Sequence, residues 1–550
     1  MALFLLFAAL LAAPVPQPTA ESRLSPSASG VENADALQRM LDAGGRVLVS
    51  EPGDYKIART LLIGDDTTLE CASGVRLVKS DEVGPFSQVI LNRGALTRTW
   101  NRNIAIRGLE LVVNGMDSPW SWNVFGLRGQ LAFFYVKDLR IERFRCFDVG
   151  RMQYCIHICT FEDVVVDDVR IAGWKDGVHF GRGRRFAVRN GYFDTGDDPI
   201  ALNAHDYSTG NPELGWIEDG VIENCHDMEN PERTVGYFCR ILAGAWCDWR
   251  KGMEVQQSDT VVHGGSLYRV AMEPDGRVYV SLTPPTHKRG IREYDGIRWA
   301  WVQDEVTYTC GCRNVAFRNI FLHQPRPEFS IHFDNDRYSR SYYPGAPVPE
   351  QTGLTFDNVQ VLHDGPQEFM RIYTPVDSIS LVRCALRRGG FSFLSNEAMS
   401  DYGKTRIRLE NCRLPADGDW RLIRSSVTNK VVEVLESGSV RVDRGAVEVS
   451  SDGTSTAFYF RVAGRIEQGG NFLLIEAVRP DGTAETLQTS LIHLTDEDGI
   501  LLPSGDYGTI LPPNAVLFHV VDRTWPQGTR FTLTLYDRDG MQLQGGVAII

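Results

Sequence analysis

Three aspartates are the strongest candidates for acid–base chemistry in this sequence. Asp176 belongs to the segment Trp-Lys-Asp-Gly, and Asp197 and Asp198 stand together in Thr-Gly-Asp-Asp-Pro. Carboxylates that lie close together repel one another, so at least one of them holds a proton near neutral pH. A protonated carboxyl beside an ionised one is what hydrolysis of a glycosidic bond requires. Asp-Gly and Asp-Asp are also common in turns, so this hypothesis depends on a fold that brings the two segments together.

A repeat in the sequence predicts such a fold. Apolar residues recur at relative positions 0, 2, 5 and 7, and asparagine often occupies position 4. Copies begin at Ile104, Leu139, Val164, Phe186, Val315, Leu354, Ile379 and Ile407. The starts from Leu139 to Val164 to Phe186, and from Leu354 to Ile379 to Ile407, are 22 to 28 residues apart, a period typical of solenoids. Leucine-rich repeats share this period, but their consensus is absent. Short strands between Gly, Asp and Asn turns instead predict an all-β protein, a right-handed parallel β-helix.

The repeat also predicts how the aspartates lie relative to one another. Asp176 comes 12 residues after Val164, and Asp198 comes 12 residues after Phe186. Both therefore occupy the same point on adjacent coils, and neighbouring strands are about 4.8 Å apart. We expect Asp176 and Asp198 to lie side by side, with Asp197 next to them.

Seven further residues are predicted to contact a substrate, because they lie near the aspartates or on the chain that follows them. They are His179, Asn203, His205, Asp206, Arg240, Trp246 and Lys251. The histidines and the tryptophan have structural alternatives, since a buried histidine can be held by hydrogen bonds and a buried indole by packing. The expected partner is a polysaccharide or oligosaccharide.

The remaining segments predict the domain organisation. Residues 1–20 are apolar and then rich in small residues and proline, which is typical of a secretory signal and predicts a secreted or periplasmic protein. Residues 21–435 are expected to form the β-helix. Within them, residues 255–310 leave the repeat and read as aromatic-rich hairpins, an inserted β module. Residues 436–550 are strand-like without the repeat, which favours a C-terminal β-sandwich.

A short amphipathic helix is expected to cover the open end of the first coil. The candidate N-cap is Asn33, and Ala36, Leu37, Met40 and Leu41 would share one apolar face.

Composition narrows the possible partners. The formal net charge of −13 disfavours nonspecific binding to nucleic acid or to an anionic membrane surface. After residue 20 no apolar run is long enough to span a membrane. The eleven cysteines lack the spacing of a zinc site and mostly fall on strand positions, where a small buried apolar role is expected. No metal and no cofactor is expected.

The aspartate motifs resemble those of a known family. Asp176-Gly177 followed by Gly196-Asp197-Asp198 is similar to the signature of the polygalacturonase-type glycoside hydrolases, family 28, of the pectin-lyase-like β-helix superfamily. The resemblance implies an inverting hydrolase in which Asp197 is the general acid. It implies that Asp176 and Asp198 hold and deprotonate the attacking water.

The sequence also departs from this family. Where the family has Asn-Thr before the first aspartate, this sequence has Trp-Lys. The family's Gly-His-Gly motif is absent after the paired aspartates, and no clear Arg-Ile-Lys motif follows. Arg240 could take over a substrate contact, and His205 or His179 could replace the missing histidine. These changes indicate a sugar other than plain polygalacturonate.

Two other functions fit the same fold. In a polysaccharide lyase the aspartates would bind Ca²⁺, and Arg240 or Lys251 would abstract the proton next to a uronate carboxyl. A non-catalytic β-helix adhesin or tailspike would only bind glycans.

Overall fold

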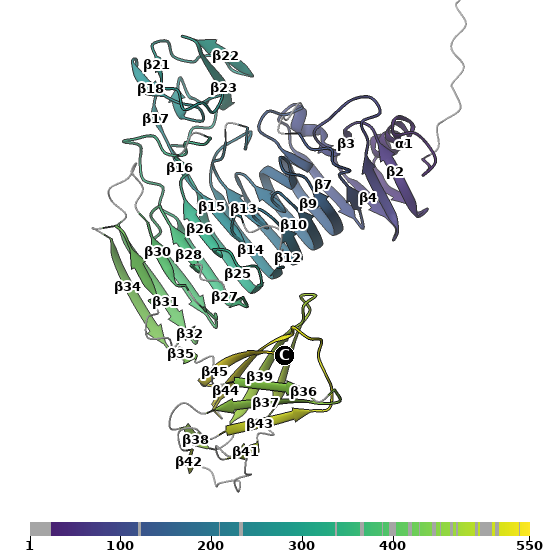
Figure 1. Cartoon of the computed structure of the whole chain (residues 1–550). Helices are drawn as coiled ribbons and strands as arrows, with labels where there is room; N and C mark the ends of the chain where they lie inside the picture. The colour runs from purple at the N-terminus through teal and green to yellow at the C-terminus, as the bar shows by residue number, and fades with distance from the viewer. Residues whose placement is uncertain are drawn as a thin grey trace, which may run out of the picture.

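The computed structural model describes most of the chain (Figure 1). The described residues are 24–118, 123–207, 209–229, 235–335, 338–363, 368–387, 389–394, 403–415, 421–427, 430–442, 447–451, 453–461, 466–468, 471–489, 493–495, 509–511, 516–537 and 539–550. The predicted signal segment, residues 1–20, lies outside them. No helix among the described residues is long and apolar enough to cross a membrane.

The core of the molecule is a right-handed parallel β-helix of stacked coils, as predicted. Its strands form three parallel ladders, and a full coil adds one strand, or one part of a long strand, to each. The first ladder contains β1 (Gly45–Val49), β4 (Thr67–Cys71), β7 (Asn101–Arg107), β9 (Gly129–Val149), β10 (Tyr154–Gly173), β12 (Gly183–Thr195), β14 (Ile217–Asp227), β25 (Cys312–Leu322), β27 (Thr352–Val361), β29 (Ser378–Val382), β31 (Lys404–Glu410) and β34 (Val431–Ser437).

The second ladder contains β2 (Gly53–Ile57), β5 (Val75–Lys79), β8 (Glu110–Val112), the later parts of the long strands, β32 (Arg413–Pro415) and β35 (Val440–Val442). The third ladder contains β3 (Leu61–Ile63), β6 (Ile90–Asn92), the first parts of β9 and β10, β11 (Val178–Phe180), β13 (Ile200–Asn203), β15 (Cys239–Leu242), β26 (Phe329–His332), β28 (Met370–Ile372), β30 (Phe391–Phe393) and β33 (Ile423–Ser425). We call the third ladder the site ladder. A short 3-10 helix, Arg93–Leu96, follows β6.

The asparagines of the repeat explain the bend between two ladders. Asn190, Asn224, Asn319, Asn358 and Asn411 all have φ between 51° and 56°, the left-handed conformation that asparagine tolerates. Their amides also bond from coil to coil. Asn224 donates to Asn190 at 3.2 Å, and Asn319 donates to Asn224 at 2.9 Å. Asn190, Asn224, Asn319 and Asn358 therefore each turn the chain and fasten their coil to the preceding one.

One α-helix, α1 (Gly30–Ala43), covers the first coil. Its start differs from the prediction, because Ser29 and not Asn33 is the N-cap. Ser29 and Glu32 bond to each other's backbone N–H groups in a capping box, which fixes the start one turn earlier. Leu37 and Leu41 are buried against the coil, as expected from the apolar face.

A module of mostly antiparallel strands interrupts the solenoid between β15 and β25 (Figure 1). Its strands pair β16 (Gly244–Ala245) with β24 (Thr309–Cys310), β18 (Met253–Val255) with β21 (Tyr279–Ser281), and β17 (Cys247–Asp248), β19 (Thr260–His263), β20 (Ser266–Val270), β23 (Ile297–Gln303) and β22 (Ile291–Tyr294) in one sheet. Trp299 and Tyr268 lie in its own apolar core. Strands β14 and β25 nevertheless pair directly, so the module projects from the stack without displacing it.

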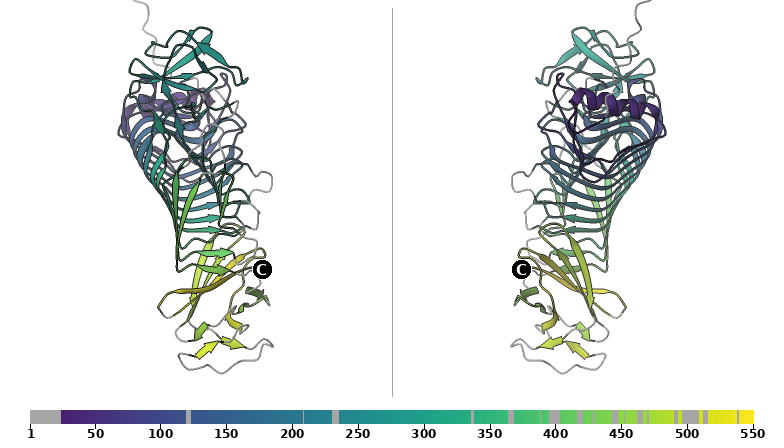
Figure 2. Two further views of the ribbon diagram at one scale, coloured as in Figure 1. Left: turned by 90° about the vertical axis from the view of Figure 1, so that its left-hand side faces the viewer. Right: turned by 90° about the vertical axis from the view of Figure 1, so that its right-hand side faces the viewer.

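The chain ends in two four-stranded antiparallel sheets beyond the last coils (Figure 2). One contains β36 (Val447–Ser451), β37 (Thr456–Arg461), β43 (Val516–Val521) and β41 (His493–Thr495); the other contains β40 (Ala484–Thr489), β39 (Phe472–Val478), β44 (Arg530–Tyr536) and β45 (Gln542–Ile549). A small pair, β38 (Ile466–Gln468) and β42 (Thr509–Leu511), lies beside them. Both sheets contribute to one core around Phe458, Trp525 and Phe531.

All eleven cysteines are free thiols, and ten of them are buried. Burial raises the pKa of Cys71 to about 12, so this thiol is an apolar core group at neutral pH.

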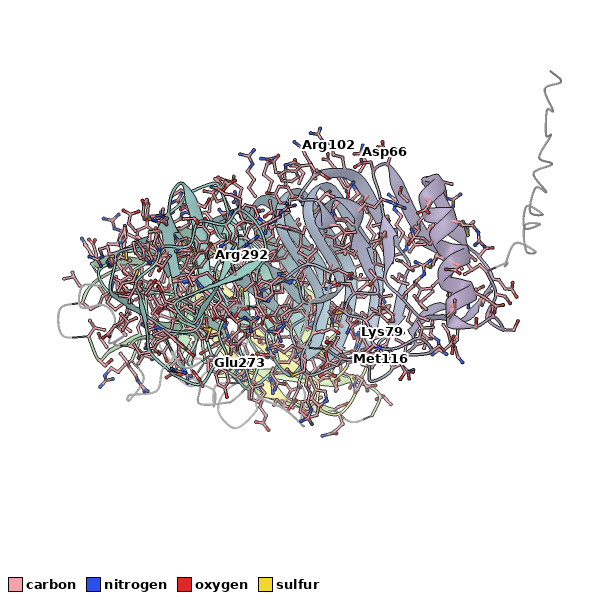
Figure 3. All side chains as sticks on the ribbon, turned by 90° about the horizontal axis from the view of Figure 1, so that it is seen from above. Asp66, Lys79, Arg102, Met116, Glu273 and Arg292 are labelled. Carbon is pink, nitrogen blue, oxygen red and sulfur yellow. The ribbon has the colours of Figure 1, made fainter. Side chains whose placement is uncertain are left out.

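A buried lysine in the first coils generates a pH-dependent prediction (Figure 3). The Lys79 ammonium donates to the Ser87 carbonyl at 2.7 Å and to Gln130 Oε1 at 2.9 Å, and burial lowers its pKa to about 7. Between that value and the ordinary 10.5, the unfolded chain keeps a proton that the folded chain has released. The free energy of unfolding should therefore rise with pH in this window, by about 1.4 kcal/mol per unit at most. In Lys79→Gln this slope should disappear.

Denaturant titrations at about pH 7 and about pH 9 measure the slope. Lys56→Gln, at an exposed site on β2, is the matched control and should leave the slope unchanged. Equal slopes in the wild type and Lys79→Gln would contradict the prediction.

Candidate active site

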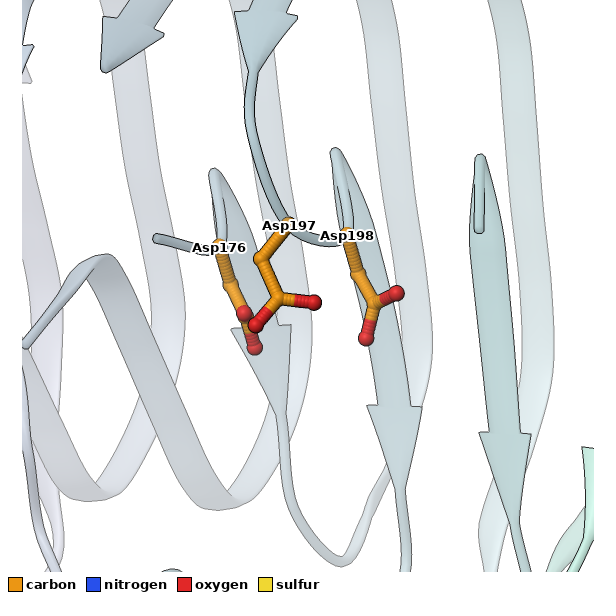
Figure 4. A group of neighbouring side chains, drawn as sticks. All are labelled: Asp176, Asp197 and Asp198. Carbon is orange, nitrogen blue, oxygen red and sulfur yellow. The ribbon is translucent and has the colours of Figure 1, made fainter. Parts of the chain in front are cut away.

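The parallel stacking places the aspartates at one end of two neighbouring strands of the site ladder. Val178 pairs with Ile200, and Asp176 and Asp198 each lie two residues before these partners. The two aspartates therefore occupy the same point on adjacent coils, and Asp197 lies beside them (Figure 4). One carboxylate oxygen from each of the three lies within 4.8 Å of the others.

The three carboxyl groups differ in accessibility. Asp176 is 2% exposed and Asp198 is 1% exposed, whereas 20% of the Asp197 side chain remains accessible. Asp198 Oδ1 accepts the Tyr237 N–H at 2.8 Å, which fixes its carboxyl group. Of the three, Asp197 can most readily meet a bound molecule.

Lys175 supplies a positive charge within this acidic cluster. Its ammonium lies 3.3 Å from Asp176 Oδ1 and bonds to Asp197 Oδ2. Burial alone would lower the pKa of Lys175, but the attraction of Asp176 and Asp197 outweighs burial and raises it. Lys175 is therefore charged, and it offsets the repulsion between the two carboxylates that it bridges.

The remaining charge imbalance falls on Asp198. Burial raises its pKa well above the ordinary 3.8, and repulsion from Asp197 and Asp176 adds to the effect. The opposite holds for Asp176, where burial is outweighed by Lys175 and His179 and the pKa is lowered. The pKa values of neighbouring carboxyls are thus shifted in opposite directions, the arrangement that suits acid–base catalysis.

His179, Asn203 and Asp206 lie together next to Asp176. His179 Nδ1 lies 2.9 Å from Asp176 Oδ2, and its Nε2 lies 3.6 Å from Asp206 Oδ2. Asn203 donates to Asp206 Oδ2 at 3.2 Å, and the Tyr154 hydroxyl donates to the same oxygen at 3.0 Å. The His179 ring also stacks on Tyr154 with the centroids 3.9 Å apart. This group orients Asp176 from behind.

Arg240 lies on the same outward row of the site ladder, one coil after Ala201 and two coils after His179. Its guanidinium donates to Asp334 Oδ2 at 2.9 Å and lies 3.9 Å from Asp206 Oδ1. Burial would lower the pKa of Arg240, but Asp334 and Asp198 raise it. Arg240 is a fixed cation and not a base.

The structure places three other predicted residues differently. His205 is buried against Thr260 of the module, its Nε2 3.3 Å from the hydroxyl, and burial lowers its pKa to about 3. Trp246 belongs to the apolar core, and its indole N–H donates to the Thr307 carbonyl at 2.6 Å. Lys251 lies in an exposed turn between β17 and β18. His205 and Trp246 anchor the module, and Lys251 has no contact with the aspartates.

A pocket of about 600 Å³ opens beside the cluster and is walled partly by the module. Lys175 and Tyr207 line it on the solenoid side, and Gln257, Pro274 and Arg298 line it on the module side. Since Lys175 also bonds to Asp197, it connects the pocket wall with the carboxylates. This volume is in the range of small-ligand sites.

Two residues that sequence reasoning missed hold the site together. One is Lys175, whose position directly before Asp176 was a signal in the sequence. The other is Arg326, whose buried guanidinium pairs with Asp227 and donates to the Asp197 carbonyl at 2.9 Å and the Val235 carbonyl at 3.1 Å. Arg326 fixes the turn that carries Asp197 and Asp198, but no motif marks a residue 129 positions away.

Comparison with known proteins finds solved structures of low similarity. No family model and no curated protein matches the chain. The family 28 exopolygalacturonase of Yersinia enterocolitica is 13% identical over 74% of this chain and 75% of that one, with a TM-score of 0.39. The Streptococcus pneumoniae surface adhesin PfbA is 11% identical over 84% and 95%, with a TM-score of 0.34. Gene product 12 of bacteriophage phi29 is 10% identical over 77% and 52%, with a TM-score of 0.47.

The protonation of Asp198 predicts a second pH effect. Its raised pKa means that the folded chain keeps a proton that the unfolded chain releases above about pH 4. The free energy of unfolding should fall as pH rises from there towards the raised pKa, by up to about 1.4 kcal/mol per unit. Asp198→Asn should lack this fall and become relatively more stable towards neutral pH. Melting curves across this range measure it, and parallel pH curves for both proteins would contradict it.

Lys175 leads to a prediction about metal ions. Removing its ammonium in Lys175→Met leaves three close carboxylates, the oxygen ligands that Ca²⁺ prefers. The variant should melt at a lower temperature than the wild type, and millimolar Ca²⁺ should restore part of the loss. The melting temperature of the wild type should not respond to Ca²⁺. The control Lys251→Met should melt like the wild type and should not respond to Ca²⁺ either. A Ca²⁺-dependent rise in the melting temperature of the wild type would contradict the role assigned to Lys175.

Proposed function

We propose that this protein is a glycoside hydrolase that cleaves a polysaccharide or oligosaccharide by inverting acid–base catalysis. The observation that carries the proposal is the close carboxyl cluster of Asp176, Asp197 and Asp198, in which the pKa values of the neighbours on adjacent coils are shifted in opposite directions. The resemblance of their motifs to family 28 supports the same reaction class.

Accessibility and charge suggest the role of each carboxyl. Asp197 is the proton donor to the leaving oxygen, because its side chain is the most exposed of the three. Asp176, whose pKa is lowered, accepts the proton of the attacking water. Asp198 holds the proton of the cluster at rest, and carboxyls this close titrate as a group, so the proton can pass to Asp197. Water is consumed, one glycosidic C–O bond breaks, and the proton returns to the cluster.

The distance between the carboxyl groups bears on whether hydrolysis inverts or retains the anomeric configuration. Inverting enzymes usually hold acid and base about 6.5–9.5 Å apart, and retaining enzymes about 5–5.5 Å. In this cluster the nearest oxygens lie within 4.8 Å. Inversion therefore requires that Asp176 and Asp198 both serve the water, while Asp197 turns outward to the leaving oxygen.

The same contacts disfavour the lyase alternative. A lyase of this kind would bind Ca²⁺ between the aspartates, where the Lys175 ammonium lies. It would also need a base, and the pKa of Arg240 is raised, which is the wrong direction for proton abstraction. Lys251 is exposed and lies apart from the cluster.

The module supports action near the end of a glycan chain. It walls one side of the pocket beside Lys175, and a closed side leaves room for few sugar units. We place the reaction outside the cytoplasm, on the basis of the apolar N-terminal segment. The product profile on oligosaccharides distinguishes single-unit release from internal cleavage.

The proposal predicts activity that depends on the aspartates. The purified full chain, screened against pectic, marine and other glycans with reducing-end detection, should release reducing ends from at least one. Asp197→Asn and Asp176→Asn should each lower kcat at least about 100-fold, because each removes a proton-transfer group. Asp81→Asn, an exposed aspartate in the first coils, is the control and should retain full activity.

NMR of the first-formed anomer should show inversion. Retention would refute the assigned roles. Unsaturated products that disappear with a chelator would establish the lyase instead. Turnover that survives Asp197→Asn would remove Asp197 as the donor.

A further inference from the structure

A second hollow lies at the opposite end of the site-ladder strands. Its volume is about 450 Å³, and its walls include residues 160–162, 182–184 and 214–216 of the solenoid. Gln303, Glu305 and Thr307 of the module's return segment close it on the other side. Asp176 precedes β11, whereas Arg182, which lines the hollow, follows this strand. The hollow also shares no lining residue with the pocket beside Lys175. The hollow is therefore separate from the carboxyl cluster.

Two indole rings line this hollow, and both are held in place. Trp100 is 39% exposed, and its ring meets the edge of Tyr135 with the centroids 5.4 Å apart. The Tyr135 hydroxyl in turn donates to the buried Glu213 at 2.8 Å. Trp216 is half-buried, with the Arg313 guanidinium 3.6 Å from its ring centre. Aromatic faces fixed in advance can stack on a flat apolar ligand surface at little entropic cost.

Each charged residue of the walls already forms an ion pair. Arg182 bonds to Glu305 at 2.5 Å, and Arg184 bonds to Glu162 at 2.7 Å. Glu218, also in the wall, lies 3.3 Å from the Arg313 guanidinium. The walls thus present no uncompensated charge to attract an ion. Their carboxylate and hydroxyl oxygens can still accept hydrogen bonds from hydroxyl groups.

We propose that this hollow is a second glycan-binding site, which takes a neutral sugar segment and performs no chemistry. Indole faces and paired polar groups suit a ring that has an apolar face and a rim of hydroxyls. The site lies on the same ladder as the carboxyl cluster, so a bound glycan can hold the protein on its substrate. The inference concerns binding alone and stands whether or not the cluster cleaves glycans.

Calorimetry on the full chain tests it, with cellohexaose, xylohexaose and mannohexaose as probes and tri-galacturonate as the anionic comparison. The Asp197→Asn background removes the proposed proton donor, so that turnover does not obscure the binding measurement. At least one neutral probe should bind. Trp100→Ala should weaken its binding about tenfold or more through loss of the stacking face, and Trp100→Phe should weaken it less.

Phe147→Ala is the matched control, because Phe147 is 56% exposed and lines neither pocket. It should leave the affinity unchanged. The proposal fails if no neutral probe binds, if Trp100→Ala and Trp100→Phe both bind as tightly as the parent, or if tri-galacturonate competes more strongly at Trp100 than the neutral probes. Melting curves of each variant show that a loss of binding is not a loss of folding.

Discussion

In-register parallel stacking is the constraint on which the rest of this structure depends. Each coil places the same repeat position directly beside its counterpart on the next coil, so every side chain meets a neighbour of equivalent position. Inside the solenoid this brings apolar residues into continuous rows, such as Phe317 stacked on Phe356 with the centroids 4.9 Å apart. At the bend it brings asparagine onto asparagine. The position of a residue within its repeat therefore decides which distant residues it contacts.

The same constraint makes charge placement consequential. On the outer face the row Glu162, Arg184, Glu218 and Arg313 alternates in sign from coil to coil, which is favourable for cross-strand neighbours. In the row that contains Asp176 and Asp198, the stacking places like charges side by side. Two features accommodate this repulsion: the ammonium of Lys175 lies between the carboxylates, and the pKa of Asp198 is raised, which favours its neutral form. Like charges also meet nearer the surface, as at Arg145 and Arg170, but at the candidate site both members of the pair are buried.

Much of this architecture could be predicted because the repeat reports directly on register. The 12-residue offset of Asp176 and Asp198 within their copies was enough to place them side by side. Features set by local competition were harder to predict. Ser29 caps α1 in place of Asn33, because its capping box with Glu32 satisfies two backbone groups at once. The contacts of His205 and Trp246 depend on how the module folds over the coils, which no periodicity encodes. Arg326 reaches the site from a coil whose sequence separation conceals its proximity.

The module between β15 and β25 also has a consequence for the order of folding. Coils contact only their neighbours, so those up to β15 can stack while the later chain is still unfolded. The turn that carries Asp197 is nevertheless fixed by Arg326, which lies beyond the insertion. The entropic cost of closing a loop rises only slowly with its length, so the insertion is thermodynamically tolerable. During synthesis, however, Asp197 and Asp198 emerge more than a hundred residues before Arg326, which fixes their turn. The carboxyl cluster is therefore among the last parts of these coils to reach its final geometry, after the module has emerged and the stack has resumed.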